Sequence, residues 1–451
     1  MATPNIVFMH SHNTGTFVQP YGHAVPTPNL QKLAEEGITF RKAFAAAPTC
    51  SPSRASFLSG MYPHSAGMLG LAHRGFSMND ASQHIVQVLK AEGYVTALSG
   101  VEHTFPELSL VGYDRVMSSL DTNYSKTAAG YYPYSDGQPD EADGAVAFLN
   151  ESHDRPFFLS VGLNETHRPF PKADASQHPG EDERYALAPS PLPDVPETRA
   201  DAADFKAAAR IMDKKYGRVL DALDSNGLTG NTIVFCFADH GLQFPRNMCN
   251  LTDQGSRVYL VIRGPGGFSG GKVIDSLVSL VDIVPTAYEI AGVDCPSFVQ
   301  GESLKPLIGG VGEVRDEVFC EVNYHAAYEP MRSVRTERYK YIKRYDGREK
   351  HVLPNTDDTP SKAFILDHNW EAFPRDQEML FDLIFDPHEA HNIAADPTAS
   401  RILKNMRGRL DGWMRKTGDP LVDSDHVRAP SGSRVNSVDG RSPREEPETI
   451  D

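Results

Sequence analysis

The chain has 451 residues, of which 44 are Lys or Arg and 60 are Asp or Glu, so its formal net charge is −16. This length suffices for one large and one smaller domain, and a content of 40% hydrophobic residues excludes disorder over most of the chain. The acidic balance argues against binding to nucleic acid or to an acidic membrane surface, which needs dense Lys and Arg. A small anionic substrate is compatible with it, because a pocket can differ in charge from the whole protein.

Targeting and cysteine patterns narrow the class of protein. The sequence has no apolar run of about 18 residues, so we expect no membrane-spanning helix. Its first residues lack the basic and apolar regions of a signal peptide, and we therefore expect a cytoplasmic protein. The odd number of cysteines and the absence of a C-x-x-C pair argue against a disulfide framework and a structural zinc site.

The first 300 residues repeat a pattern of apolar strand and polar loop. Residues 5–9 predict a buried strand, and a Thr-Pro pair at residues 27 and 28 predicts the start of a helix that ends before Gly37. Apolar strands with helical patterns between them indicate a parallel sheet that is covered on both faces. Ligands of such sheets bind beyond the carboxyl ends of the strands, so we expect the polar residues there to form one site. The other predicted elements are strands at 94–98, 156–163 and 232–237 and a helix at 207–223.

Beyond about residue 310 the pattern changes. Residues 332–343 alternate like a half-exposed antiparallel strand, residues 380–383 resemble another strand, and apolar residues between 402 and 414 fall at helical spacing. The last residues are rich in Ser, Pro, Gly and charge, which predicts an extended or mobile tail. We therefore predict a catalytic domain at 1–310, an α+β subdomain at 311–428 and a tail at 429–451.

The most specific motif is C-S-P-S-R at residues 50–54, which small residues and Gly60 follow. Here the sequence resembles the type I sulfatases of the alkaline phosphatase superfamily, whose signature is C-x-P-x-R, and in particular sulfamidase (N-sulfoglucosamine sulfohydrolase) and its bacterial relatives. The resemblance implies an α/β fold with a large mixed sheet between helices and a smaller C-terminal α+β domain. The segments that carry it are 27–30, 50–60, 67–71, 155–159, 239–241, 331–334, 380–382 and 386–392.

The resemblance also implies a mechanism. In that family the motif cysteine, here Cys50, is oxidised to formylglycine by a maturation enzyme, and the hydrated form supplies the attacking oxygen. A sulfate ester spreads negative charge over its oxygens, so the site must neutralise them and place the attacking oxygen in line. Arg54 is expected to hold the nucleophile and the metal ligands. His167 matches the residue that protonates the leaving group, a role that suits a histidine because its usual pKa lies near neutrality, and His103 matches the residue that promotes sulfate release.

The metal ligands depart from the family pattern. Sulfatases have two Asp residues after the first strand, where this chain has His12 and Asn13, and Asp-Asn or Asp-His after a late strand, where Asp239 and His240 fit. Imidazole nitrogen and amide oxygen can still coordinate, so the predicted ligands are these four side chains and an oxygen of modified Cys50. Ca²⁺ is the family expectation, whereas two imidazoles favour Mn²⁺ or Zn²⁺.

Two cationic residues that hold sulfate in many sulfatases are missing. Val101 stands where a Lys-x-His motif has its lysine, and Met248 is in register with the second cation, for which Arg246 and Arg257 are the nearest replacements. The exchange of acidic metal ligands for neutral ones nevertheless predicts a locally cationic pocket.

These residues predict hydrolysis of a sulfate ester or sulfamate, with a carbohydrate as one candidate substrate. His73, Arg74 and Arg168 are candidates for substrate binding, with solvated surface charge as the competing interpretation. One alternative is a phosphonate monoester or phosphodiester hydrolase, because such relatives share the Asp-His pair. Another is a catalytically impaired binding protein, which the replaced residues suggest. The resemblance further implies a homo-oligomer.

Overall fold

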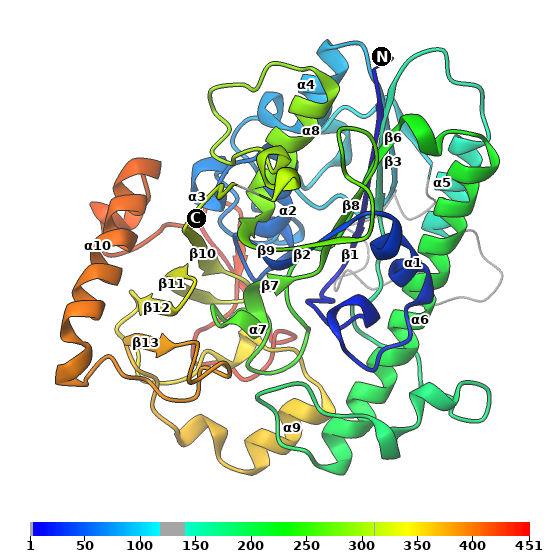
Figure 1. Ribbon diagram of the computed structural model, residues 1–451. Coiled ribbons are helices and arrows are strands. Elements are labelled where there is room, and N and C mark those ends of the chain that lie inside the picture. Colours follow the sequence, from blue (N-terminus) through cyan, green and yellow to red (C-terminus); the bar gives the residue numbers. More distant parts are fainter. Residues whose placement is uncertain (1–2, 118–139, 311) are drawn as a thin grey trace.

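A large mixed sheet forms the centre of the protein. The computed structural model describes residues 3–117, 140–310 and 312–451, so residue 311, the predicted start of the C-terminal subdomain, lies outside the described residues (Figure 1). Strands β3, β5, β1 and β6 run parallel, whereas β8 is antiparallel to β6, which confirms the predicted fold class. In spatial order the sheet contains β4 (Arg115–Val116), β3 (Val95–Gly100), β5 (Phe157–Gly162), β1 (Asn5–Ser11), β6 (Thr232–Ala238), β8 (Leu260–Arg263), β2 (Ile38–Phe44) and β7 (Arg257–Val258), and β9 (Lys272–Ser279) pairs with β2.

Helices cover both faces of this sheet, which explains why its central strands are apolar throughout (Figure 1). All seven residues of β1 are buried, and the ring of Phe8 packs edge-on against Phe158 and Phe235 at 5.1 Å between centroids. One face carries α1 (Pro28–Glu36), α5 (Glu141–Leu149) and α6 (Pro196–Ser225), and the other carries α2 (Cys50–Ser59), α4 (Ile85–Ala91) and α8 (Ile283–Ala291). Further α-helices are α3 (Pro63–Ala66), α7 (Asp253–Ser256), α9 (Pro360–Asp367) and α10 (Ser400–Thr417).

A second, antiparallel sheet follows β9 in the chain. It consists of β10 (Glu317–Tyr324), β11 (Tyr328–Thr336), β12 (Tyr339–Arg344) and β13 (Glu378–Asp382), and α10 packs on β11 and β12. The prediction of one half-exposed strand at 332–343 is wrong. The segment is a hairpin with a two-residue turn at Glu337 and Arg338, and neither residue is the Gly or Asn that usually marks such a turn. β11 is buried along most of its length because both faces of this sheet are covered.

The predicted tail at 429–451, hereafter the C-terminal segment, docks on the protein. It contains a small antiparallel pair, β14 (Arg434–Val435) and β15 (Glu448–Thr449). Ser433 and Asn436 are buried, and the backbone N–H of Asn436 donates to the carbonyl of Ala326 at 2.8 Å. None of the helices in the described ranges combines the length and apolar character that a membrane crossing needs.

A buried ionic cluster joins α3 to the second sheet. The Arg332 guanidinium lies between Asp419, at 3.0 Å from Nη2 to Oδ1, and Glu321, at 3.6 Å from Nε to Oε2. His64 hydrogen-bonds to Glu321 through Nδ1. The two carboxylates and His64 are close enough to hold a cation, but Arg332 already supplies the positive charge. The cluster is therefore a structural ion pair network.

Replacing Arg332 with Met should destabilise the protein by about 3–5 kcal/mol at neutral pH, because it leaves two buried carboxylates unpaired. Although burial alone would raise the pKa of Asp419, the charge of Arg332 holds this pKa below its usual value. The contribution of Asp419 is therefore complete above its unfolded-state pKa and is lost as the pH falls through its folded-state pKa. Denaturant unfolding at several pH values should show a deficit that shrinks in acid. The matched variant Arg338→Met, which breaks a partly exposed pair with Asp382, should lose less than about 1 kcal/mol, and an equal loss would contradict this account.

Candidate active site

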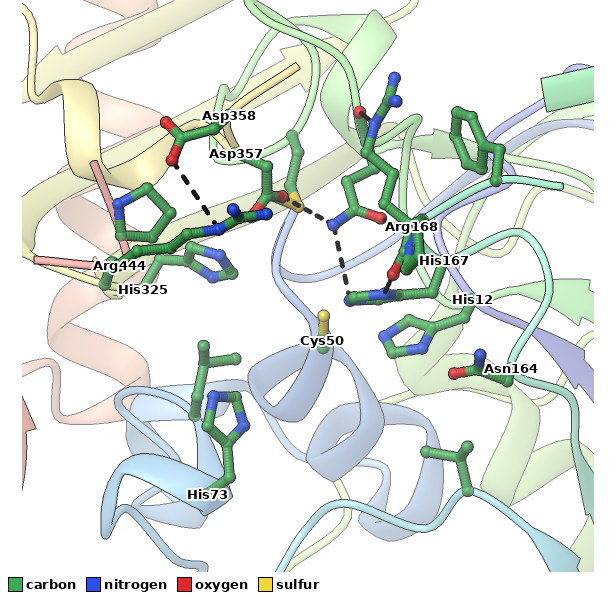
Figure 2. Close-up of a pocket in the computed structure, with 18 of the residues that line it drawn as sticks. His12, Cys50, His73, Asn164, His167, Arg168, His325, Asp357, Asp358 and Arg444 are labelled. Carbon is green, nitrogen blue, oxygen red and sulfur yellow. Dashed lines mark hydrogen bonds and ion pairs between the residues drawn. The ribbon is translucent and has the colours of Figure 1, made fainter. Parts of the chain in front are cut away.

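The carboxyl ends of four parallel strands open into one pocket of about 660 Å³, as the strand pattern predicts (Figure 2). Cys50, the first residue of α2, points into this pocket from the end of its helix (Figure 2). Residues from distant parts of the chain therefore surround its side chain. From the loops after β1, β3 and β5 come His12, Val101, His103, Asn164 and His167, all of which line the pocket.

The predicted metal ligands lie together beside Cys50. Ligand atoms of His12, Cys50, Asp239 and His240 are all within 4.8 Å of one another. The His240 Nε2 atom lies 3.5 Å from the Cys50 sulfur, and the side-chain oxygen of Asn13 accepts from that sulfur at 3.8 Å. The structure thus brings together all five residues that the sequence assigns to the metal.

The chemistry of these donors fits a divalent cation. His240 donates its Nδ1 hydrogen to the carbonyl of Gly241 at 3.0 Å, which leaves the Nε2 lone pair facing Cys50. Both ring nitrogens of His12 are buried, and neither has a hydrogen-bond partner among the described residues. Burial, assisted by the charge of Arg54, lowers the pKa of His12 well below its usual value, so the imidazole is neutral and able to coordinate. With two such imidazoles the donor set suits Mn²⁺ or Zn²⁺ better than Ca²⁺.

Arg54 balances the charge of Asp239, the carboxylate of this group. Both side chains are fully buried, with Arg54 Nη2 at 3.0 Å from Asp239 Oδ2. The other oxygen of Asp239 accepts from the backbone N–H groups of Asn13 and His240, each at 2.8 Å. A second nitrogen of Arg54 donates to the Val101 carbonyl at 3.1 Å. Arg54, one helical turn after Cys50, therefore contacts the candidate ligand Asp239 directly and fixes its orientation.

The Cys50 thiol is held in its protonated form by the protein groups around it. Burial raises the pKa of Cys50 well above its usual value, and the negative charge of Asp239 acts in the same direction against the weaker opposing effect of Arg54. These protein groups by themselves therefore favour the thiol over the thiolate, which is the reactive form of cysteine.

His167 belongs to a hydrogen-bond network centred on Gln243. His167 Nδ1 lies 2.6 Å from its neighbour's carbonyl oxygen, and Nε2 lies 3.5 Å from the amide nitrogen of Gln243. The same amide nitrogen donates to Asp357 at 2.6 Å, while the amide oxygen accepts from Asn13 at 2.8 Å. Burial lowers the pKa of His167, and the charge of Asp357 opposes this effect. Gln243 thus links the candidate acid to a candidate metal ligand.

His103 and His73 form a stacked pair on the other side of the pocket. His103 Nε2 and His73 Nδ1 are 2.9 Å apart, so one imidazole donates to the other. Burial lowers the pKa of His103 well below its usual value and the pKa of His73 to about 3. Both rings are neutral, and His73 orients His103.

The described side chains by themselves do not make the pocket cationic, and the predicted cationic character, which includes a bound metal, stays a prediction. Their histidines are neutral, because burial lowers their pKa values. Val101 and Met248 line the pocket, whereas Arg246 lines a separate hollow and Arg257 donates to the carbonyl of Arg41. Cationic and acidic residues are balanced in the lining: Arg74, Arg168, Lys172 and Arg444 against Asp201, Asp204, Asp357 and Asp358.

Two of the three candidate substrate-binding side chains are committed to protein partners. Arg168 forms a two-pronged ion pair with Asp201, at 2.6 and 2.9 Å, and donates to the Gln243 carbonyl. Arg74 donates to Asn436 at 2.7 Å and to the Pro443 carbonyl at 3.2 Å. Together with His73, which orients His103, they line the pocket and shape it through these neighbours.

Sequence reasoning missed several residues of this pocket, among them Gln243, His325, Asp357 and Arg444. Gln243 follows the Asp239-His240 pair by a few residues, so its place in that loop was a usable signal. His325 and Asp357 come from loops of the second sheet, and Arg444 comes from the C-terminal segment. No motif marks these three, and only the docking of the C-terminal parts brings them to Cys50.

Comparison with known proteins identifies the family. Residues 4–293 match the sulfatase family, and residues 239–369 match the family described as N-sulphoglucosamine sulphohydrolase, C-terminal. The chain is 27% identical to human N-sulphoglucosamine sulphohydrolase over 449 residues, which cover 88% of this chain and 87% of that protein. It is 25% identical to an ulvan-active sulfatase of Formosa agariphila over 465 residues, covering 92% and 75% of the two chains.

Solved structures agree on the fold. A protein in complex with its substrate D-glucosamine-2-N,6-O-disulfate has a TM-score of 0.72 at 20% identity, covering 94% of this chain and all of that one. The phosphonate monoester hydrolase of Agrobacterium radiobacter has a TM-score of 0.68 at 19% identity, covering 92% and 96% of the two chains. The alkaline phosphatase-like fold is common to both, while the match over residues 4–293 distinguishes the family. The chain therefore belongs to the sulfatase family and is a sulfuric ester hydrolase.

Proposed function

We propose that the protein hydrolyses a sulfate ester or sulfamate of a carbohydrate, with a formylglycine made from Cys50 as the nucleophile and a divalent metal as cofactor. The position of Cys50 carries this proposal. Its sulfur lies among three metal-ligand candidates at the start of α2, and it belongs to the C-S-P-S-R motif of residues 50–54. A motif cysteine that is placed for attack beside a metal site fits the precursor of a formylglycine nucleophile. The proposal therefore requires a formylglycine-generating enzyme as partner.

The residues around Cys50 have separate tasks in this proposal. A metal held by His12, Asn13, Asp239 and His240 would supply positive charge next to the sulfate oxygens. Arg54 keeps Asp239 in place, and α2, which begins at Cys50, presents the positive end of its helix dipole to the anion.

Two histidines carry out the proton transfers in this proposal. His167 lies on the pocket wall beside Gln243, and in its protonated form, which the charges of Asp357 and of a bound sulfate favour, it gives a proton to the leaving oxygen or nitrogen. His103, oriented by His73, accepts the proton that is released when sulfate leaves. One imidazole therefore donates a proton when the ester or sulfamate bond is cleaved, and the other accepts a proton when sulfate is released.

The names of the similar proteins support a carbohydrate as the substrate. The similar human protein is named for N-sulphoglucosamine and the Formosa protein for ulvan, both of which are carbohydrates. A pocket of about 660 Å³ has room for a sugar-sized group in addition to the sulfate.

The test compares rates of the matured, metal-loaded protein on an aryl sulfate, on glucosamine N-sulfate and on a phenyl phosphonate ester. We expect sulfate release from the first two at rates well above that of phosphonate cleavage. A faster phosphonate reaction would instead identify a phosphonate monoester hydrolase, and absence of turnover on all three would favour the impaired binding protein. The homo-oligomer is part of the same proposal, and sedimentation of the purified protein tests it.

Replacing His167 with Asn should lower kcat by about 10²–10⁴-fold on substrates with poor leaving groups, because it removes the acid. Aryl sulfates whose leaving group needs no proton should lose much less. A series of substituted aryl sulfates measures this difference as a steeper dependence of rate on leaving-group pKa. An equal loss across the series would show that His167 has another role. His325→Asn, in the same pocket, is the control and should leave the slope of the series unchanged.

A further inference from the structure

The C-terminal segment forms one wall of the active-site pocket, and Pro443 and Arg444 line the same space as Cys50. Several contacts fix this segment. Arg74 donates to Asn436 and to the Pro443 carbonyl, and Arg434 donates to the His73 carbonyl at 2.6 Å. The segment therefore contacts the histidine that orients His103, and its path past the pocket is defined.

Arg444 differs from the other cationic residues of the pocket. The Arg168 guanidinium is bound by Asp201, and the Lys172 ammonium by Asp204 at 2.7 Å. Arg74 is committed to the C-terminal segment. The side chain of Arg444 is 83% exposed, and its one ion-pair contact, with Asp358, is long at 3.9 Å. Among the described lining residues, Arg444 is the cation with the most open hydrogen-bonding capacity.

The neighbouring acid does not neutralise Arg444. Asp358 accepts from the Lys362 ammonium at 3.1 Å and from the Ser442 hydroxyl at 2.5 Å. Its negative charge is thus balanced by Lys362, and the positive charge of Arg444 stays available. Figure 2 shows Arg444 entering the pocket from the side of His325 and Asp358. An arginine fork in such a position suits a carboxylate or sulfate, which it can bind through two parallel hydrogen bonds.

We propose that Arg444 determines specificity by binding a second anionic group, a sulfate or carboxylate, on a saccharide whose scissile sulfate lies at Cys50. This inference rests on the proposed function and adds the class of substrate, namely saccharides with at least two anionic groups. The scissile sulfate occupies the inner end of the pocket, and the second anion lies toward its open mouth.

The test uses the matured, metal-loaded protein with three substrates: glucosamine N-sulfate, glucosamine 2-N,6-O-disulfate, and N-sulfoglucosamine linked to a hexuronate. Arg444→Gln should lower kcat/KM by about tenfold or more on the disulfate or the hexuronate, mainly through KM, and leave the monosulfate unchanged. The substrate on which the variant loses kcat/KM shows whether the second anionic group is a sulfate or a carboxylate. Arg444→Lys should restore part of the loss. Arg441→Gln is the matched control, because Arg441 lies in the same segment but pairs with Glu371 outside the pocket.

Equal effects of Arg444→Gln on all three substrates, or no effect on any, would overturn the inference. Turnover of glucosamine N-sulfate by the unaltered protein tests the proposed function separately. Should that turnover be absent, calorimetric titration with the disulfate and the monosulfate decides the role of Arg444. The variant should then lose affinity for the disulfate alone, and unchanged affinity would overturn the inference.

Discussion

Cys50→Ala should lower sulfate hydrolysis by about 10⁴-fold or more, because it removes the side chain from which the nucleophile is made. Cys50 is buried at the start of α2, within 4.8 Å of three metal-ligand candidates, and alanine leaves only a small gap there. The variant should therefore fold. Rates on an aryl sulfate at saturating metal, together with thermal unfolding, measure the two properties separately.

Cys236→Ala is the control for this experiment. Cys236 is a buried thiol on β6, in the core of the large sheet and away from the pocket lining. Its removal costs packing energy but should leave kcat unchanged. Substantial residual activity in Cys50→Ala would show that another group attacks the sulfur.

Asp239→Asn should reduce both bound metal and kcat/KM, the latter by about 10²–10³-fold. Asp239 is the carboxylate of the predicted ligand group, and its loss leaves the buried Arg54 without its partner. The uncompensated positive charge then repels the metal from the remaining ligands. Elemental analysis of the purified protein measures the metal, and a steady-state assay measures the rate.

The matched variant is Asp357→Asn, which removes a carboxylate from the same pocket but outside the ligand group. It should retain the metal, even if its rate changes through Gln243 and His167. Full metal content in Asp239→Asn, or an equal loss of metal in both variants, would contradict the proposed coordination.

The parallel strands β1, β3, β5 and β6 of the large sheet could be predicted because their signal is local and strong. Each is continuously apolar, as the burial on both faces requires, and each predicted end lies within two residues of the observed one. The hairpin at residues 328–344 could not be predicted in this way. Its turn is formed by Glu337 and Arg338, without the Gly or Asn that usually marks a two-residue turn, so no turn signal separates the two strands.

The residues at the centre of the site could be predicted from a sequence motif, whereas the residues of its outer wall could not. The C-S-P-S-R motif and the residues after β1, β5 and β6 have fixed places relative to the sheet, so a resemblance transfers them to Cys50, His12, His167 and Asp239. The charge balance of the pocket side chains depends on pairs such as Arg168 with Asp201, which only the tertiary structure forms, so it cannot be derived from the sequence. Arg444 reaches the pocket through the docking of a polar segment whose composition predicts mobility.

The mass of the tryptic peptide at residues 43–54 tests the central claim most directly. In protein produced together with a formylglycine-generating enzyme, we predict that Cys50 loses two hydrogens and exchanges sulfur for oxygen, and that the rate of sulfate release rises in proportion to the converted fraction. Sulfate release from protein in which this peptide retains an intact thiol, or complete conversion without any sulfate release, would contradict the account.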